Sequence, residues 1–149
     1  MTTSEILIDD KQVKDLLNRL SSLTKNMSPA FREIGETILL SVQDNFKNEG
    51  RPSWKKLSDK WTIPARAKKG KWPGKILQVS GKLLRSVNYK VFPDGVIIGT
   101  ADIRARMLNF GGTTGLGTKI PPRPFMTVQD KDVKDIIKIL QDKITEMTK

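Results

Sequence analysis

The chain has 149 residues, the size of one ordinary domain, so a single domain over residues 1–149 is expected. It carries 27 Lys and Arg against 16 Asp and Glu, a net charge of +11, and it contains no His and no Cys. The two absences exclude disulfides, zinc fingers, thiolate metal sites, Cys nucleophiles and every mechanism that needs a His base.

A strand and a helix are predicted at the start of the chain. Residues 4–8 have the apolar character of a short strand, and Asp9 or Asp10 suits the N-cap of the helix that follows. That helix is predicted over residues 10–25, because apolar side chains recur there at helical spacing. They are Val13, Leu16, Leu17, Leu20 and Leu23.

A second amphipathic helix is predicted over residues 29–48. Ser28 is its expected N-cap, Pro29 suits the first helical position, and Gly50 is the expected stop. Its apolar face consists of Phe31, Ile34, Ile38, Leu39, Val42 and Phe46.

The middle of the chain, residues 50–75, lacks clear periodicity and predicts a long, partly ordered loop. Loops of this length in compact domains are usually functional or disordered. The charge is concentrated here, since residues 47–90 carry 13 basic and 2 acidic side chains, against 5 and 7 in residues 1–46 and 9 and 7 in residues 91–149. Such a block indicates a polyanion or an acidic protein as partner.

Short elements alternate in the second half of the chain. A helix over 81–86, capped by Ser80, is followed by strands over 88–92 and 95–100 and a helix over 103–109. An exposed Gly-rich loop over 110–119 then leads to an extended Pro-rich segment over 120–128, with a strand after Pro124. The chain continues into a helix capped by Asp130. The apolar run Val96–Ile98 predicts that its strand is buried on both faces. The last helix has an apolar face of Val133, Ile136, Ile137, Leu140, Ile144 and Met147.

This order predicts an α+β fold. A small, mostly antiparallel sheet is expected to be packed by the N-terminal and C-terminal helices, with long basic and Gly-rich loops at the surface.

Basic and aromatic side chains are interleaved in the central loop. The candidate interaction surface comprises Arg51, Trp54, Lys55, Lys56, Lys60, Arg66, Lys68, Lys69, Lys71, Trp72, Lys75 and, further along the chain, Arg123. Three interpretations stay open: nucleic-acid binding through phosphates and stacked bases, a solvated lysine face over buried Trp side chains, and a subunit interface against acidic patches.

The remaining polar clusters do not predict catalysis. The Gly-rich stretch over 111–119 lacks the order of a phosphate-binding loop, and we expect it to become ordered on assembly. The Asp residues at 9, 10, 130, 132 and 135 lie at expected helix starts, where they cap free N–H groups. The Pro-rich segment over 120–125 is interpreted as a stiff connector with Arg123 as an interface anchor, although it also fits a polyproline ligand. No catalytic, metal or cofactor site is therefore predicted.

The order of the motifs resembles the phage virion morphogenesis family over residues 31–145. The resemblance is carried by Phe46, Gly50–Ser58, Ile76-Leu77, Ser80–Leu83, Ser86-Val87, Val96–Gly99, Asn109–Gly112 and Ile120–Phe125. Among these, the positions expected to be structural are Trp54, Gly81, Gly99, Phe110, Gly111, Gly112, Pro121, Pro124 and Phe125. Where the family often has Tyr-Ala and His, this chain has Arg104-Ala105 and Leu108, so no role that depends on that Tyr or His is carried over.

The resemblance implies a non-enzymatic tail-completion protein of Mu-like and related tailed phages. Such proteins act at the head-proximal end of the tail, and related ones commonly form six-fold rings. The expected partners are further copies of the chain, in a ring such as a hexamer, together with tail-tube and head–tail connector proteins, and non-specific DNA contact is also open. The alternative function is a nucleic-acid-binding module built on the Trp-containing segment 47–90.

Neither a signal peptide nor a membrane span is expected. Residues 1–5 lack a basic start, and apolar runs such as 38–40 fall far short of the roughly 20 residues that cross a bilayer. The resemblance then places the protein in the virion, after assembly in the host cytoplasm.

Overall fold

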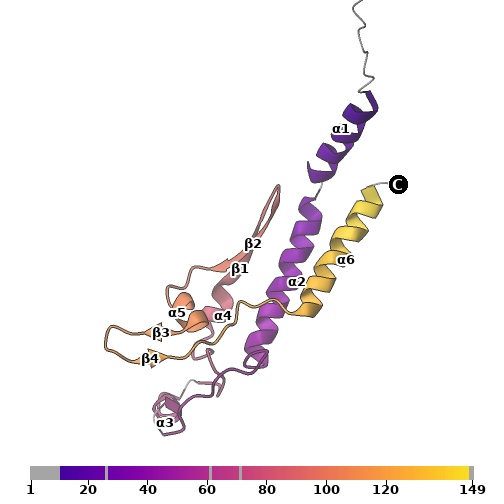
Figure 1. Ribbon diagram of the computed structural model, residues 1–149. Coiled ribbons are helices and arrows are strands. Elements are labelled where there is room, and N and C mark those ends of the chain that lie inside the picture. Colours follow the sequence, from indigo (N-terminus) through magenta and orange to yellow (C-terminus); the bar gives the residue numbers. More distant parts are fainter. Residues whose placement is uncertain (1–10, 26, 61, 71, 148–149) are drawn as a thin grey trace, which may run out of the picture.

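The computed structural model describes residues 11–25, 27–60, 62–70 and 72–147 (Figure 1). Its elements are α1 (Lys11–Lys25), α2 (Ser28–Lys47), α3 (Thr62–Ala67), α4 (Lys82–Ser86), β1 (Val87–Phe92), β2 (Gly95–Thr100), α5 (Ala105–Phe110), β3 (Gly112–Thr113), β4 (Lys119–Ile120) and α6 (Asp130–Met147). They confirm the predicted α+β fold, because short antiparallel strand pairs are combined with long helices. The strand predicted over 4–8 lies outside the described residues.

Helix α2 is the central element of the fold. It packs against both β1 and β2 on one side and against α6 on another (Figure 1). The approach to the sheet is close at Gly35, where an added Cβ would lie 2.5 Å from the Tyr89 ring. A side chain at position 35 would therefore push α2 away from β1.

The hairpin of β1 and β2 is paired antiparallel, with Val87 opposite Thr100 and Phe92 opposite Gly95. The prediction that β2 is buried on both faces is wrong, since Ile97 is 63% exposed whereas Ile98 packs on the core. In a two-stranded sheet with α2 on one face, successive side chains alternate between the helix and solvent.

Helix starts differ from the predicted caps. Met27, not Ser28, occupies the N-cap of α2, and Gly81, not Ser80, occupies that of α4 with a φ of 69°. At α6, the backbone N–H of Gln129 donates to Asp132 Oδ2 (2.8 Å), so Asp132 takes over the capping predicted for Asp130.

The two predicted loops contain short regular segments. Helix α3 lies within residues 50–75, and the arms of the Gly-rich loop pair as β3 and β4. The turn between them is closed by the Thr114 N–H, which donates to the Thr118 carbonyl (2.9 Å). The strand predicted after Pro124 is absent from the described residues there.

The core is centred on three aromatic side chains. The ring of Phe46, on α2, lies edge-on to Trp54 at 5.8 Å between centroids and 5.1 Å from the ring of Phe125. Trp54 Nε1 donates to the Pro124 carbonyl (3.0 Å). Gly50, with a φ of 102°, makes room for the Trp54 ring, which an added Cβ would approach to 2.5 Å.

A polar network beside these rings ties α2 to two other segments. Asn45 is fully buried, and its Nδ2 donates to the carbonyls of Phe125 (2.9 Å) and Thr127 (3.2 Å). Its Oδ1 accepts from Arg51 Nε (2.8 Å). Arg51 Nη2 also donates to Ser41, whose hydroxyl donates to the buried carboxylate of Asp132. The network therefore joins α2, the chain after it and the start of α6.

Replacing Asn45 with Ala should lower the free energy of unfolding by about 2–4 kcal/mol, because buried carbonyls and the Arg51 guanidinium lose their partner. Urea denaturation followed by circular dichroism measures the change. The control Gln43→Ala, on the exposed face of α2, should shift stability by no more than about 0.5 kcal/mol. Equal effects of the two substitutions would show that the network does not hold these segments together.

Candidate interaction surface

The structure divides the residues of the candidate interaction surface into two groups. One group is built into the fold: Arg51, Trp54 and Arg123 are held by the contacts of the core. The other group lies on the surface and includes Lys55, Lys56, Lys60, Lys68 and Lys69, all exposed. Lys71 lies outside the described residues.

Trp72 and Lys75 connect the far end of the basic loop to the fold. Trp72 Nε1 donates to the Lys75 carbonyl (2.8 Å), and Lys75 Nζ donates to the carbonyl of Lys47 at the end of α2 (3.1 Å). A cation suits this place, because the last carbonyls of a helix have no partner within it. Nearby, Glu49 Oε1 accepts the Ile76 N–H (2.6 Å).

Arg123 is only 7% exposed, which is unusual for an arginine. Its Nε donates to the Lys55 carbonyl (3.1 Å), and its backbone N–H donates to the Leu108 carbonyl (2.9 Å). Burial and the neighbouring charge of Arg66 lower the pKa of Arg123. Two guanidinium groups are thus held near each other inside the basic region.

A cavity of about 390 Å³ opens between these segments, and we call it the cationic cavity. Five of the side chains around it are basic, and none of the described residues that line it is acidic. The basic ones are Lys55, Lys56, Arg66, Lys119 and Arg123, and the apolar ones include Leu57, Ile76, Leu77, Leu108 and Ile120.

Arg66 reaches this cavity from α3. Its guanidinium lies 5.7 Å from the centre of the Trp72 ring. Its Nη1 is buried and has no hydrogen-bond partner within the described part of the chain. Burial lowers the pKa of Arg66. A buried donor without a partner is costly, so this nitrogen is suited to receive an acceptor from elsewhere.

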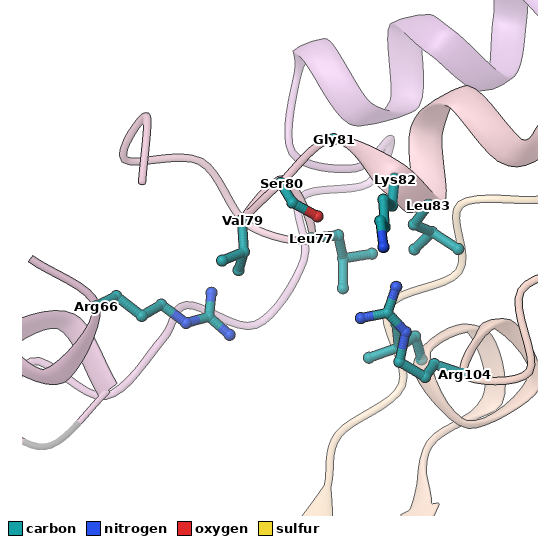
Figure 2. Close-up of a pocket in the computed structure, with 9 residues that line it drawn as sticks. Arg66, Leu77, Val79, Ser80, Gly81, Lys82, Leu83 and Arg104 are labelled. Carbon is teal, nitrogen blue, oxygen red and sulfur yellow. The ribbon is translucent and has the colours of Figure 1, made fainter. Parts of the chain in front are cut away.

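A second, smaller cavity of about 150 Å³ adjoins the first, since Arg66, Leu77 and Leu108 line both. Figure 2 shows the side chains of Arg66 and Arg104 entering it from opposite sides, with Lys82 above Leu77. The positive field therefore extends from α3 to the starts of α4 and α5.

Arg104 in this second cavity forms an ion pair with Asp102. Its Nε donates to Asp102 Oδ1 (2.9 Å), and its Nη2 donates to Oδ2. The hydrogen bonds from Arg104 lower the pKa of Asp102 to about 2.

Two of the expected structural motifs, residues 109–112 and 120–125, lie next to each other. Asn109 Oδ1 accepts the N–H groups of Phe125 (3.0 Å) and Met126 (3.1 Å), which fixes the Pro-rich segment against α5. At Gly111, with a φ of 75°, an added Cβ would lie 2.8 Å from the backbone nitrogen of Pro122. The sequence analysis did not name Asn45, and it named Asn109 within a family motif without assigning it a hydrogen-bonding role; the signal of both is a polar residue inside an otherwise apolar stretch.

The other motif positions are placed in different ways. Phe125 is fully buried, whereas Phe110 is largely exposed. Gly81 has a positive φ, and at Gly99 an added Cβ would meet no neighbour within 4 Å. Within the described residues, no group of three or more acidic side chains is placed to hold a metal ion, and no helix is long and apolar enough to cross a bilayer.

Comparison with known proteins gives the class of this chain. The model of the phage virion morphogenesis family matches residues 8–145. The chain belongs to this family, which confirms the resemblance seen in the order of its motifs.

Two relatives are similar over nearly their whole length. One is the Mu-like prophage FluMu G protein 2 of Haemophilus influenzae, 33% identical over 141 residues, which cover 93% of this chain and 94% of the relative. The other is the putative capsid assembly protein G of Escherichia phage Mu, 24% identical over 147 residues, which cover 94% and 93%. No solved structure matches.

Family membership supports a structural role in phage assembly and a place among virion-associated proteins. It also favours a non-enzymatic protein. The cationic cavity is accordingly considered as a recognition site.

In an NMR titration of the side-chain carboxyls, Asp102 should titrate with a pKa of about 2, and Arg104→Gln should raise that pKa toward its ordinary value of 3.8. Because the pKa is lower in the folded state, the stabilisation from this pair is present above about pH 4 and is lost as the pH falls toward 2. The control Arg106→Gln should leave the Asp102 pKa at about 2. An unchanged Asp102 pKa in Arg104→Gln would contradict the assignment.

Proposed function

We propose that this protein completes the phage tail or joins it to the head, as a closed ring of identical subunits at the head-proximal end of the tail. The observation that carries the proposal is the set of large apolar side chains that the fold leaves uncovered. Ile103 and Leu116 are each 96% exposed. Single exposed apolar residues are ordinary in a monomer. Here large apolar side chains are exposed on several elements of one small domain, which is typical of a protein that contacts other proteins.

The uncovered side chains lie on both the helices and the loops. On the helical side they are Leu40 of α2 and Val133, Ile137 and Ile144 of α6. On the other side they are Ile103 before α5, Phe110 at its end and Leu116 at the turn between β3 and β4. The apolar face predicted for α6 is thus only partly used within the subunit. A ring needs two different surfaces on each subunit, and separate apolar regions meet that need.

The basic loop supplies the long-range part of recognition. Its exposed lysines attract an acidic face of the tail tube, the connector or a neighbouring subunit, and this attraction speeds association at low salt. The Debye length is about 8 Å at physiological ionic strength, so added salt should slow assembly. Apolar contacts then hold the assembled state.

The proposal is tested by adding the purified protein to phage tails that were assembled without it. Electron microscopy should show a ring at the head-proximal end of each tail, and head joining should be restored. Leu116→Ser should fold normally, with a change in stability within about 0.5 kcal/mol, and should cap far fewer tails, because the exposed side chain contributes only in the assembly.

The control Lys134→Ser, at an exposed polar position of α6, should cap tails as the unchanged protein does. A protein that neither caps tails nor restores head joining would refute the proposal. A monomer in solution would not, since ring closure can depend on the tail.

Nucleic-acid binding is the second candidate, favoured by the exposed lysines at 55, 56, 68 and 69. It predicts that the isolated protein binds duplex DNA with an affinity that falls log-linearly with salt concentration. DNA binding without any effect on tails would favour this candidate over tail completion.

A further inference from the structure

The cationic cavity has the properties of a binding site whose ligand comes from outside the subunit. Its five basic side chains face a space without a carboxylate among the described lining residues. The buried Nη1 of Arg66 has no acceptor there. Arg123 is held by its hydrogen bond to the Lys55 carbonyl, and the charge of Arg66 is close enough to lower the pKa of Arg123. An anionic group would satisfy the free donor and relieve the repulsion.

The ligand must also be partly apolar. Leu77, Leu108 and Ile120 form part of the wall and are only partly covered by the subunit itself. A sugar–phosphate backbone offers no aliphatic side chain to cover them, whereas a peptide offers carboxylates and aliphatic groups together. The lining therefore favours an acidic, apolar peptide segment over DNA.

We propose that the cationic cavity binds residues Glu5–Asp10 of a second copy of this chain. This segment has the sequence Glu-Ile-Leu-Ile-Asp-Asp, with three carboxylates, three aliphatic side chains and no basic residue. Its composition complements both the charge and the apolar wall of the cavity. The inference rests on the proposed ring, because it names the contact between neighbouring subunits.

The arrangement of the helices explains why the segment comes from another subunit. In Figure 1, α1 continues away from the start of α2, while α3 lies beyond the opposite end of α2. Along the two helices, Lys11 is roughly 50 Å from Lys47 at 1.5 Å per residue. Ten residues reach at most about 36 Å when fully extended, so the segment falls short of the far end of α2, where the basic loop is attached.

This geometry also gives the contact its direction. The donor segment precedes α1 at one end of the subunit, and the cavity lies at the other. A contact between unlike ends passes from each subunit to the next, and it closes into a ring when the rotation between subunits permits. Each subunit then both gives and receives one segment.

The test uses a fluorescently labelled peptide of residues 3–10 and measures its anisotropy with increasing concentrations of the full chain. The receptor carries Asp9→Asn and Asp10→Asn, so that its own segment does not compete. Adding Arg66→Gln to the receptor should weaken peptide binding about tenfold or more, because a charge-assisted hydrogen bond is lost in a partly desolvated site. The control receptor carries Lys68→Gln and Lys69→Gln, which remove two exposed charges that follow α3 and do not line the cavity. These two substitutions should weaken peptide binding less than threefold.

Two changes in the peptide leave the protein untouched. Asp9→Asn with Asp10→Asn should weaken binding about tenfold or more, and Leu7→Ser should weaken it as well, since an apolar contact is lost. Equal binding of the neutral peptide, or equal losses in Arg66→Gln and in the Lys68 and Lys69 control, would overturn the proposal. A duplex oligonucleotide provides a further test. If it displaces the peptide from the receptor and binds more weakly to Arg66→Gln, the cavity is a phosphate site and the proposal is wrong.

The inference and the proposed function fail in different ways. If the protein caps tails and restores head joining but does not bind the peptide, the ring stands and this contact is wrong. If the peptide binds through Arg66 but tails are neither capped nor joined, the contact stands and tail completion is wrong.

Discussion

The buried amide of Asn45 determines how the three main parts of this molecule meet. Its two donors and one acceptor join α2 to the segment that leads into α6 and to Arg51 in the chain after α2. No aliphatic residue of the same size supplies these bonds, and water does not reach the site to replace them. The aromatic core can pack around Phe46 because this network sets the spacing of the segments that carry Trp54 and Phe125.

The cationic cavity depends on that spacing. One wall comes from the chain after Trp54, another from α3, and a third from the segment after β4 that contains Arg123. These walls belong to segments far apart in the sequence, and they meet because both flanks of the cavity are fixed to the same core. Among the described lining residues the cations have no acidic side chain beside them, an arrangement that costs stability.

Much of the fold follows from local patterns, and the site does not. The helices over 10–25 and 29–48 and the β1–β2 hairpin were predictable, because helical periodicity, Pro29 and the Pro93-Asp94 turn act over a few residues. The exposure of Ile97 was not, since it depends on the sheet having a helix on only one face. Arg51 and Arg66 both lie in the basic loop over 50–75. The first is hydrogen-bonded within the core, whereas Nη1 of the second has no partner in the part of the chain that the structure describes, and this difference is set by long-range packing.

The attachment of the basic loop has a mechanical consequence. The loop leaves the end of α2, returns to it, and is fastened there again by Lys75 on the Lys47 carbonyl and by Gln78 on the Phe46 carbonyl. A pull on α3 is therefore shared between the covalent end of α2 and these two hydrogen bonds, which lie on the same helix. The pull is then directed along α2 rather than into the strands β1 and β2.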